Sequence, residues 1–204
     1  MMVAMEPAVG AQALEPPRGS EDAQVSATEL DARLDWVRRS PSDHGRVELI
    51  VRRPEEEHRE VLVEAWLDPA DGLVGDNWRQ RGSSSTADGS ADPERQLTVM
   101  NARIVSLVAQ RRDRWPLAGD QLYVDFDLSL ENAPAGTRLQ VGDAVIAITA
   151  PPHTGCAKFV ERFGKEAMRY VNSPTGRELR LRGANAKVVV AGAVRPGDPV
   201  TKLE

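Results

Sequence analysis

The chain has 204 residues, of which 41% are hydrophobic and 28% charged, and its formal net charge is −5. This composition fits one soluble globular domain, and an acidic chain without a basic face argues against nucleic acid as a partner. No apolar run approaches the roughly 20 residues that a membrane-spanning helix needs. The single cysteine excludes a disulfide framework and, with three histidines, leaves too few soft ligands for an all-protein zinc site.

The N-terminal segment, residues 1–25, is rich in Ala, Pro, Gly and Glu and has no periodic apolar face. Such a segment cannot offset its own ordering entropy, so we expect a flexible tail. It also lacks the basic and apolar regions of a secretory signal, which predicts a cytoplasmic protein. We expect residues 26–204 to form one domain. The capping-box spacing of Ser26 and Glu29 predicts that this domain opens with a short amphipathic helix, which ends before Pro41.

Several short runs have the β-branched and apolar character of strands. They lie at residues 47–51, 61–66, 97–100, 104–108, 122–127, 145–149 and 188–194. The first two are separated by a charged turn and predict a hairpin. The run at 122–127 alternates apolar with polar residues, as a half-buried strand does. Residues 68–93 contain many glycines and serines without an apolar period, which predicts a long loop.

Many short strands, few helices and polar turns favour a closed or nearly closed β-barrel, in which strand edges are hidden. The pairs Gly119-Asp120, Gly142-Asp143 and Gly197-Asp198 lie beside these runs and predict turns at the barrel rims. A parallel α/β fold fits poorly, because helices do not alternate with the strands. The expected fold class is therefore mainly β with short helices.

The only cysteine, Cys156, lies at a predicted junction between a loop and a helix that has a break at Gly164. Backbone N–H groups at a helix start stabilise a thiolate, and Lys158, Arg162 and His153 add to that effect. The alternative is a buried, inert cysteine, and the spacing alone does not separate the two. Nothing in the spacing supports the base and orienting partner of a cysteine protease.

The segment around the cysteine carries a family resemblance. The pattern consists of Pro152-His153-Thr154-Gly155-Cys156-Ala157-Lys158-Phe159, Arg162-Phe163-Gly164, Arg182-Gly183-Ala184-Asn185-Ala186 and Gly197-Asp198. It resembles the MOSC signature (molybdenum-cofactor sulfurase C-terminal domain), in which a cysteine starts a short helix, an Arg-Gly turn precedes a β-rich run and a Gly-Asp turn ends the barrel. The resemblance covers roughly residues 73–200 and implies a barrel similar to that of pyruvate kinase.

The resemblance implies two roles for Cys156, as a ligand of molybdenum held by a pterin dithiolene or as a carrier of persulfide sulfur. A thiolate suits both, because it is a soft metal ligand and a nucleophile. Molybdopterin ends in a phosphate, for which the guanidinium of Arg182 is the first expected partner. Lys158 and Thr154 are further expected cofactor contacts. His153, with an ordinary pKa of about 6.5, is expected to tune the thiol or to donate a proton.

The loop at residues 75–82 is a second expected contact with the cofactor. Asn77, Trp78 and Arg79 combine an amide, an aromatic ring and a guanidinium between glycines, and such a loop can close over a pterin. The alternative is an ordinary surface turn with Trp78 packed against the end of the barrel.

Three functions stay open at this point. The first is a molybdenum-cofactor-binding protein that reduces N-hydroxylated or N-oxide compounds, as bacterial relatives of this family do. The chain has no iron–sulfur or nucleotide fingerprint, so its electrons must come from a partner protein. The second is a non-redox persulfide carrier supplied by a cysteine desulfurase, because the chain has no room for a pyridoxal-phosphate domain. The third is a binding module whose cysteine is structural.

Overall fold

The computed structural model describes residues 12–13 and 24–203. The helices and strands of these residues are β1 (Gln12–Ala13), α1 (Ala27–Ala32), α2 (Leu34–Arg38), β2 (Gly45–Arg52), β3 (Glu60–Leu62), β4 (Ala65–Asp68), β5 (Gly72–Leu73), α3 (Trp78–Arg81), η2 (Pro93–Arg95), β6 (Leu97–Asn101), α4 (Ala102–Ala109), η3 (Arg112–Ala118), β7 (Leu122–Asp125), β8 (Arg138–Val141), β9 (Ala144–Pro152), α5 (Ala157–Val171), α6 (Pro174–Glu178), β10 (Ala184–Val190), β11 (Gly192–Val194) and β12 (Pro199–Leu203). The elements η2 and η3 are 3-10 helices.

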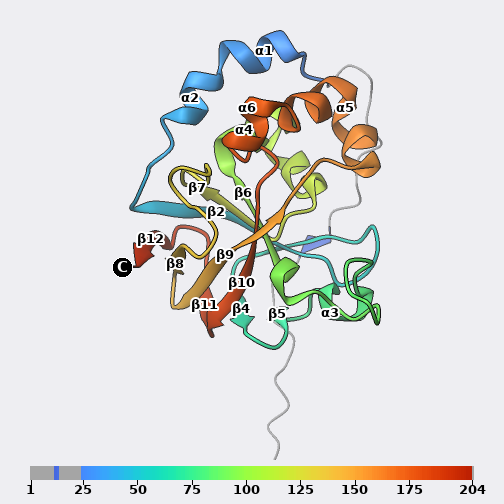
Figure 1. Cartoon of the computed structure of the whole chain (residues 1–204), viewed down its shortest axis with the longest axis vertical. Coiled ribbons are helices and arrows are strands. Elements are labelled where there is room, and N and C mark those ends of the chain that lie inside the picture. Colours follow the sequence, from blue (N-terminus) through green and yellow to red (C-terminus); the bar gives the residue numbers. More distant parts are fainter. Residues whose placement is uncertain (1–11, 14–23, 204) are drawn as a thin grey trace, which may run out of the picture.

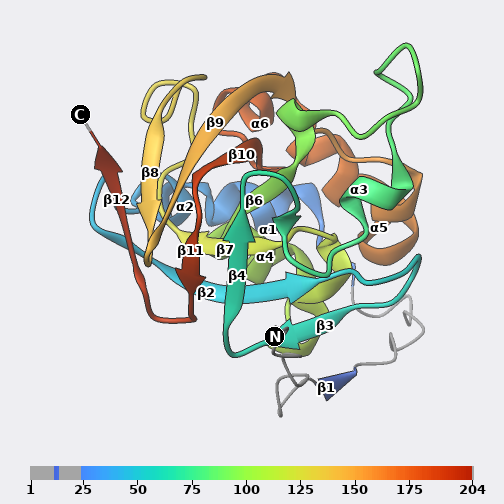
Figure 2. The same ribbon diagram turned by 90° about the horizontal axis from the view of Figure 1, so that it is seen from below.

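Nine strands of the described residues form one sheet in the order β1-β3-β2-β12-β8-β9-β10-β6-β7. A further pairing of β2 with β7 closes seven of them, from β2 round to β7, into a barrel. The pair β6–β7 is parallel and the other pairs in this sheet are antiparallel. Strands β4, β5 and β11 form a small second sheet at one end of the barrel (Figures 1 and 2). The mainly β fold with short helices confirms the predicted fold class.

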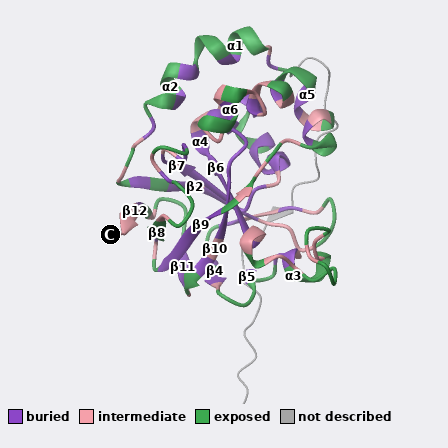
Figure 3. Ribbon diagram, in the orientation of Figure 1, coloured by how far each residue is buried: buried purple, intermediate pink, exposed green. Residues whose placement is uncertain are grey.

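The barrel wall carries apolar side chains on both of its faces. On β7, Leu122 and Val124 belong to the cluster inside the barrel, whereas Tyr123 belongs to a second cluster under the helices. Figure 3 shows the buried strands beneath helices whose outer faces are exposed. The run at 122–127 was predicted to be half-buried. The structure corrects this, because α4 packs on the outer face of β7.

The run at 104–108 was predicted to be a strand and is instead helix α4. The side chain of Asn101 starts this helix by accepting from the N–H groups of Arg103 at 2.8 Å and Ile104 at 3.3 Å. Ile104, Val105 and Val108 are fully buried and recur at helical spacing. Their β-branched shape favours strands, but packing against the barrel decides the structure here.

The other predicted elements are found with altered boundaries. The predicted first helix has its capping box but breaks at Arg33 into α1 and α2. Strands β2 and β3 form the predicted hairpin, while β4 leaves it for the small sheet. The run at 188–194 is divided between β10 and β11. In the long segment at 68–93, short elements break up the predicted loop.

The predicted glycine-containing turns are confirmed by the backbone. Gly119, Gly142 and Gly197 have φ angles of 86°, 57° and 95°, a region that glycine enters without steric cost. Gly164 has φ 88° and ψ 165°, so it breaks α5 as predicted.

The predicted flexible tail is only partly described. Its residues 1–11 and 14–23 lie outside the described residues. Of the remainder, β1 pairs with β3, and Val25 is buried against the helices.

Candidate functional site

One rim of the barrel brings together segments that are far apart in the sequence. His153 directly follows β9, and Arg182 lies just before β10. These two segments meet because Pro152 pairs with Ala184. Asp120 precedes β7, which runs beside β6 at the same rim. The chain then enters α5 from this rim, with Cys156 at the N-terminal cap of the helix.

A pocket of about 620 Å³ opens at this rim, beside α3 and the start of α5, which lie on the same side of the barrel (Figure 2). Its polar lining is predominantly cationic. The positively charged lining residues are Arg53, Arg59, Arg81, Arg95, Lys158, Arg162 and Arg182, and the acidic ones are Glu55, Glu56 and Glu57. A cationic concave surface of this size suits an anionic small molecule.

Asp120 is completely buried behind the pocket and links two of its lining residues. Its carboxylate accepts from Arg182 Nη1 at 2.7 Å and lies 3.1 Å from His153 Nε2. Burial by itself would raise the pKa of Asp120, but the adjacent Arg182 and His153 hold it below its usual value. Asp120 is therefore an ionised carboxylate that can only accept hydrogen bonds.

His153 is oriented by this carboxylate. Burial, followed by repulsion from Arg182, lowers the pKa of His153, so its ring is neutral at pH 7. Because Asp120 only accepts, the proton of the neutral ring lies on Nε2. The bond to Asp120 is the only hydrogen bond of this ring within the described residues. The lone pair of Nδ1 is therefore available as an acceptor on a residue that lines the pocket.

Arg182 is buried beside this pair and its charge is compensated. Its terminal nitrogens donate to Asp120 at 2.7 Å and to the carbonyl of Ala118 at 2.8 Å. Its guanidinium also lies 5.0 Å from the ring centre of Phe159. The sequence predicted a phosphate ligand at Arg182. The structure shows a guanidinium that positions Asp120, with only Nε lacking a partner among the described residues.

Cys156 is exposed and lines the pocket. Its carbonyl accepts from the N–H groups of Phe159 and Val160, at 3.0 and 3.1 Å, and its side chain makes no capping hydrogen bond. The preceding Gly155 is fixed by Asn172, which accepts from its N–H at 2.9 Å. The predicted loop-to-helix junction is confirmed, and the thiol is not the buried, inert group of the alternative interpretation.

The remaining predicted contacts divide into two groups. Lys158 and Asn77 line the pocket. Thr154 is exposed and lies outside the lining, and Arg79 lies outside it as well, donating to Asp71 at 2.7 Å. Trp78 is buried, as the surface-turn alternative proposed. The loop thus contributes Asn77, with Gln80 and Arg81 in place of Arg79.

Sequence reasoning missed three of the seven basic lining residues, namely Arg53, Arg59 and Arg95. Arg53, directly after β2, forms a double hydrogen bond with the buried Asp76, with both distances 2.9 Å. Arg81 lies in the loop at 75–82 that the sequence predicted as a cofactor contact, and it makes no ion pair within the described residues. Asp120 was noticed only as part of a Gly-Asp turn. No local pattern marks Arg53 or Asp120, because strands distant in sequence bring them to the pocket.

Partnerless polar atoms concentrate in the same pocket. In the described part of the chain, four buried side-chain atoms lack a hydrogen-bond partner, and all four belong to pocket-lining residues. They are Nε of Arg59, Arg95 and Arg182 and Oδ1 of Asn77, and of these the Nε of Arg95 forms an ion pair at 3.3 Å with Asp92. Buried polar groups are nearly always paired in native proteins, so this concentration points to a ligand that completes the pairing.

These residues fit a cofactor that carries an anionic phosphate and a sulfur-bound metal. Cys156 supplies a soft ligand, and the basic lining supplies the countercharge. Among the described residues, no group of three or more His, Cys, Asp or Glu side chains is arranged to hold a metal ion. A metal here would therefore depend on donors that a cofactor brings.

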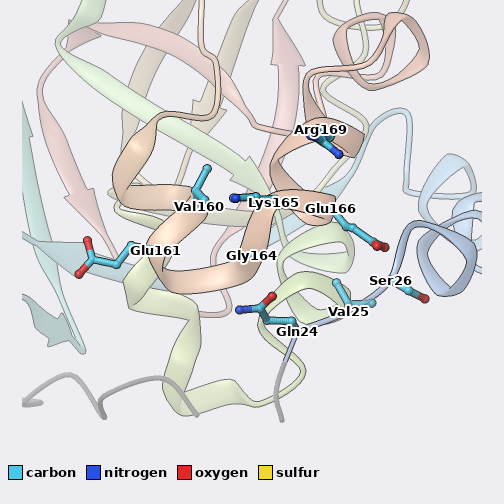
Figure 4. Close-up of a pocket in the computed structure, with 9 residues that line it drawn as sticks. All are labelled: Gln24, Val25, Ser26, Val160, Glu161, Gly164, Lys165, Glu166 and Arg169. Atoms are coloured by element: carbon cyan, nitrogen blue, oxygen red, sulfur yellow. The ribbon is translucent and has the colours of Figure 1, made fainter. Parts of the chain in front are cut away.

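A second pocket, also of about 620 Å³, lies between residues 24–26 and the middle of α5 (Figure 4). Its lining includes Lys165, Glu166 and Arg169. Glu166 accepts from the backbone N–H of Ala27 at 2.9 Å. This second pocket is lined by no cysteine and shares no lining residue with the pocket at the rim.

The fold and the site together describe a mixed β-barrel protein with one exposed thiol at the barrel rim. The chain belongs to the MOSC domain family, whose model matches residues 86–201. This match confirms the resemblance found in the sequence. Within the described residues, no helix is both long enough and apolar enough to cross a membrane.

Two solved structures with TM-scores above 0.5 support the fold, and a third is similar at a lower score. A hypothetical protein is 19% identical with a TM-score of 0.53, and the match covers 79% of this chain and 68% of that one. The YuaD protein of Bacillus subtilis is 16% identical with a TM-score of 0.52, covering 76% and 93%. YiiM of Escherichia coli is 19% identical with a TM-score of 0.49, covering 78% and 70%. A comparison with curated proteins found no match.

Proposed function

We propose that the chain binds a molybdenum cofactor at the rim pocket and reduces N-hydroxylated or N-oxide compounds. The observation that carries this proposal is the exposed thiol of Cys156 in a cationic pocket that also contains the partnerless buried polar atoms. Membership of the MOSC family supports it. The exposed free thiol suits a reducing compartment, so we place the protein in the cytoplasm.

Specific residues would hold each part of the cofactor. Cys156 would ligate the metal through its thiolate. Arg81 would bind the phosphate, because it lines the pocket and makes no ion pair within the described residues. Asn77 and Arg59 would complete their hydrogen bonding with polar atoms of the ligand. The cofactor, when bound, would supply a metal that can accept and deliver electrons.

The other residues prepare the site for the substrate. Reduction of a hydroxylamine to an amine takes up two electrons and two protons and releases water. A partner protein would donate the electrons. Asp120 fixes the Nε2–H tautomer of His153, so Nδ1 can accept a hydrogen bond from the N–H or O–H of an N-hydroxylated compound. This contact would orient the substrate beside Cys156.

Metal and pterin analysis tests the proposal. The protein is purified from hosts with and without pterin cofactor biosynthesis, and molybdenum and pterin are measured per chain. We expect both in wild type from the competent host, and loss of molybdenum in Cys156→Ser. Thr154→Val is the control, because Thr154 is exposed outside the pocket and should load normally. Wild type without molybdenum or pterin in either host would contradict the proposal.

A second function is favoured by the same exposed thiol. The thiolate of Cys156 could attack the outer sulfur of a donor persulfide, taking that sulfur and releasing the donor as its thiolate. A cysteine desulfurase is the expected donor. Intact mass would then show one added sulfur atom on the wild type and none on Cys156→Ser. Bound pterin with an unmodified thiol would exclude this function.

A further inference from the structure

One wall of the rim pocket is the loop between β2 and β3, residues 53–59, which is tied to α5 by two neighbouring carboxylates. Glu56 Oε1 accepts from Lys158 Nζ at 2.7 Å, and Glu57 contacts both Lys158 and Arg162. Glu57 Oε1 accepts from Lys158 Nζ at 2.6 Å, and Glu57 Oε2 accepts from Arg162 Nη2 at 2.5 Å. Arg59 Nη1 lies 3.7 Å from the same Oε2. Glu57, Arg59, Lys158 and Arg162 all line the pocket, so the Glu57 carboxylate is surrounded there by three positively charged side chains.

The backbone at Glu57 is held in an unfavourable conformation. Its φ angle is 60°, in the left-handed region that residues with a Cβ rarely adopt. Such conformations persist where surrounding contacts impose them, and they gather at switch segments. Here the imposing contacts are those to Lys158 and Arg162, so loss of these ion pairs would let the loop relax.

The buried Arg59 depends on the negative charge of the Glu57 carboxylate. The residue is only 8% exposed, and its Nε has no partner among the described residues. Within those residues, its hydrogen bond goes to the carbonyl of Glu57, at 3.1 Å, and its ion pair to the carboxylate of the same residue. Burial, followed by repulsion from Arg162, lowers the pKa of Arg59. Without Glu57 the buried guanidinium would have no countercharge.

We propose that Glu57 is an internal stand-in for an anionic group of the pocket's ligand, and that a phosphate-class oxyanion replaces it between Lys158, Arg162 and Arg59. The exchange would loosen the 53–59 loop from α5, because the exposed ion pair of Glu56 with Lys158 would be, among the described residues, its remaining side-chain contact with the first turns of this helix. Phosphate carries more charge than a carboxylate and matches the two-pronged geometry of guanidinium groups. The identity of the ligand rests on the proposed function, whereas anion binding does not.

Electrostatics at Glu57 support a permanent internal anion. The hydrogen bond from Lys158, and then the charge of Arg162, lower the pKa of Glu57 to about 2. The carboxylate therefore stays charged at neutral pH and competes with any incoming anion. The substitution Glu57→Gln removes this competing charge while keeping the shape of the side chain.

The sequence offers a matched control on the same loop. Glu55 also lines the pocket, but within the described residues its side chain makes no hydrogen bond or ion pair, and only its backbone carbonyl accepts, from the N–H of His58 at 3.3 Å. Glu55→Gln and Glu57→Gln therefore remove the same charge from the same loop, and only the second removes the ion pairs of Glu57 with Lys158 and Arg162. A general effect of net charge would appear in both variants.

The test is calorimetric titration of the full chain, purified without cofactor, with inorganic phosphate at constant ionic strength. We expect Glu57→Gln to bind phosphate about tenfold more tightly than wild type, and Glu55→Gln to stay within about twofold of wild type. Arg162→Met should abolish the gain. Equal affinities for Glu57→Gln and Glu55→Gln would overturn the proposal.

Hydrogen exchange of the loop supplies a readout that does not depend on affinity. In wild type, phosphate should accelerate exchange in residues 53–59, because it displaces Glu57. In Glu57→Gln the loop should already exchange fast, and phosphate should change it little. Slower exchange of the wild-type loop on addition of phosphate would show that the anion does not displace Glu57, which also overturns the proposal.

The two proposals fail in different ways. Absence of molybdenum and pterin would contradict the proposed function and leave these phosphate titrations untouched. Repeating the titration on cofactor-loaded protein identifies the source of the anion. If loading blocks phosphate, the position receives the cofactor's own phosphate, and if phosphate still binds, it receives an anionic substrate.

Discussion

Asp120 and Arg182 form a buried ion pair of 2.7 Å at the base of the rim pocket, where neither side chain is more than 7% exposed. The same carboxylate contacts His153 through its other oxygen. One buried charge pair therefore joins two segments of the barrel rim and sets the orientation of a pocket residue. Both the stability of the fold and the orientation of His153 therefore depend on the Asp120–Arg182 ion pair.

Removing one partner of this pair should cost much more than removing both. We expect Asp120→Ala to lower the free energy of unfolding by about 3–5 kcal/mol, because it leaves the Arg182 charge buried and unpaired. In urea denaturation, the double variant Asp120→Leu/Arg182→Met should recover most of this loss. Asp113→Ala, in the exposed pair with Arg111, should change it by about 0.5 kcal/mol or less. A loss in the double variant as large as in Asp120→Ala would contradict the account.

The lowered pKa of His153 predicts a pH-dependent stability. Below its ordinary pKa of about 6.5, the unfolded chain binds a proton at this position that the folded chain refuses. The free energy of unfolding should therefore fall as pH drops from about 6.5 toward the lower folded value, and be unaffected by this group at higher pH. Urea denaturation at several pH values measures the slope.

His153→Gln should remove this slope, and His44→Asn should retain it. Gln is a suitable replacement because its terminal amide can still reach Asp120. Asn suits position 44, where φ is 52°. If His153→Gln keeps the wild-type slope, the ring of His153 is not the neutral acceptor that the pocket geometry requires.

The sequence predicted those features of the fold and site that depend on residues close together in the chain, and missed those that depend on contacts distant in sequence. The thiol at a helix start, the break at Gly164 and the Gly-Asp turns are local features, and all are confirmed. Helix α4 was missed because packing on the barrel, rather than local preference, decides its conformation. Asp120 and Arg53 escaped notice because their partners lie far away in the sequence, 62 residues for Arg182 and 23 for Asp76.

The exposed thiol predicts selective labelling of the native protein. Iodoacetamide should modify Cys156 in the folded state to one label per chain, because it is the only cysteine and is exposed. Cys156→Ser should take up no label in mass spectrometry. A compound that fills the rim pocket should slow the reaction. Labelling of wild type only after denaturation would show that the thiol is buried in solution.

Gly164 offers a test of the break in α5 by the sign of a stability change. In a continuous helix, Gly164→Ala would stabilise the protein by about 1 kcal/mol, because alanine is the better helix former. With φ 88° and ψ 165°, the backbone at Gly164 is instead nearly restricted to glycine, and an added Cβ would lie 2.5 Å from Gln24 Oε1 (Figure 4). We therefore expect Gly164→Ala to destabilise the protein by about 1–3 kcal/mol.

Two further variants separate backbone strain from the contact with Gln24. Gly136 has φ 95° and an added Cβ there would meet nothing within 4 Å, so Gly136→Ala should show strain alone. Adding Gln24→Ala to Gly164→Ala should relieve only the steric part, since Gln24 is a flexible side chain and the φ angle remains. Thermal unfolding measures all three variants. A stabilised Gly164→Ala protein would mean that α5 is continuous through this position. A continuous helix would change the placement of Cys156 and Arg162 relative to the pocket.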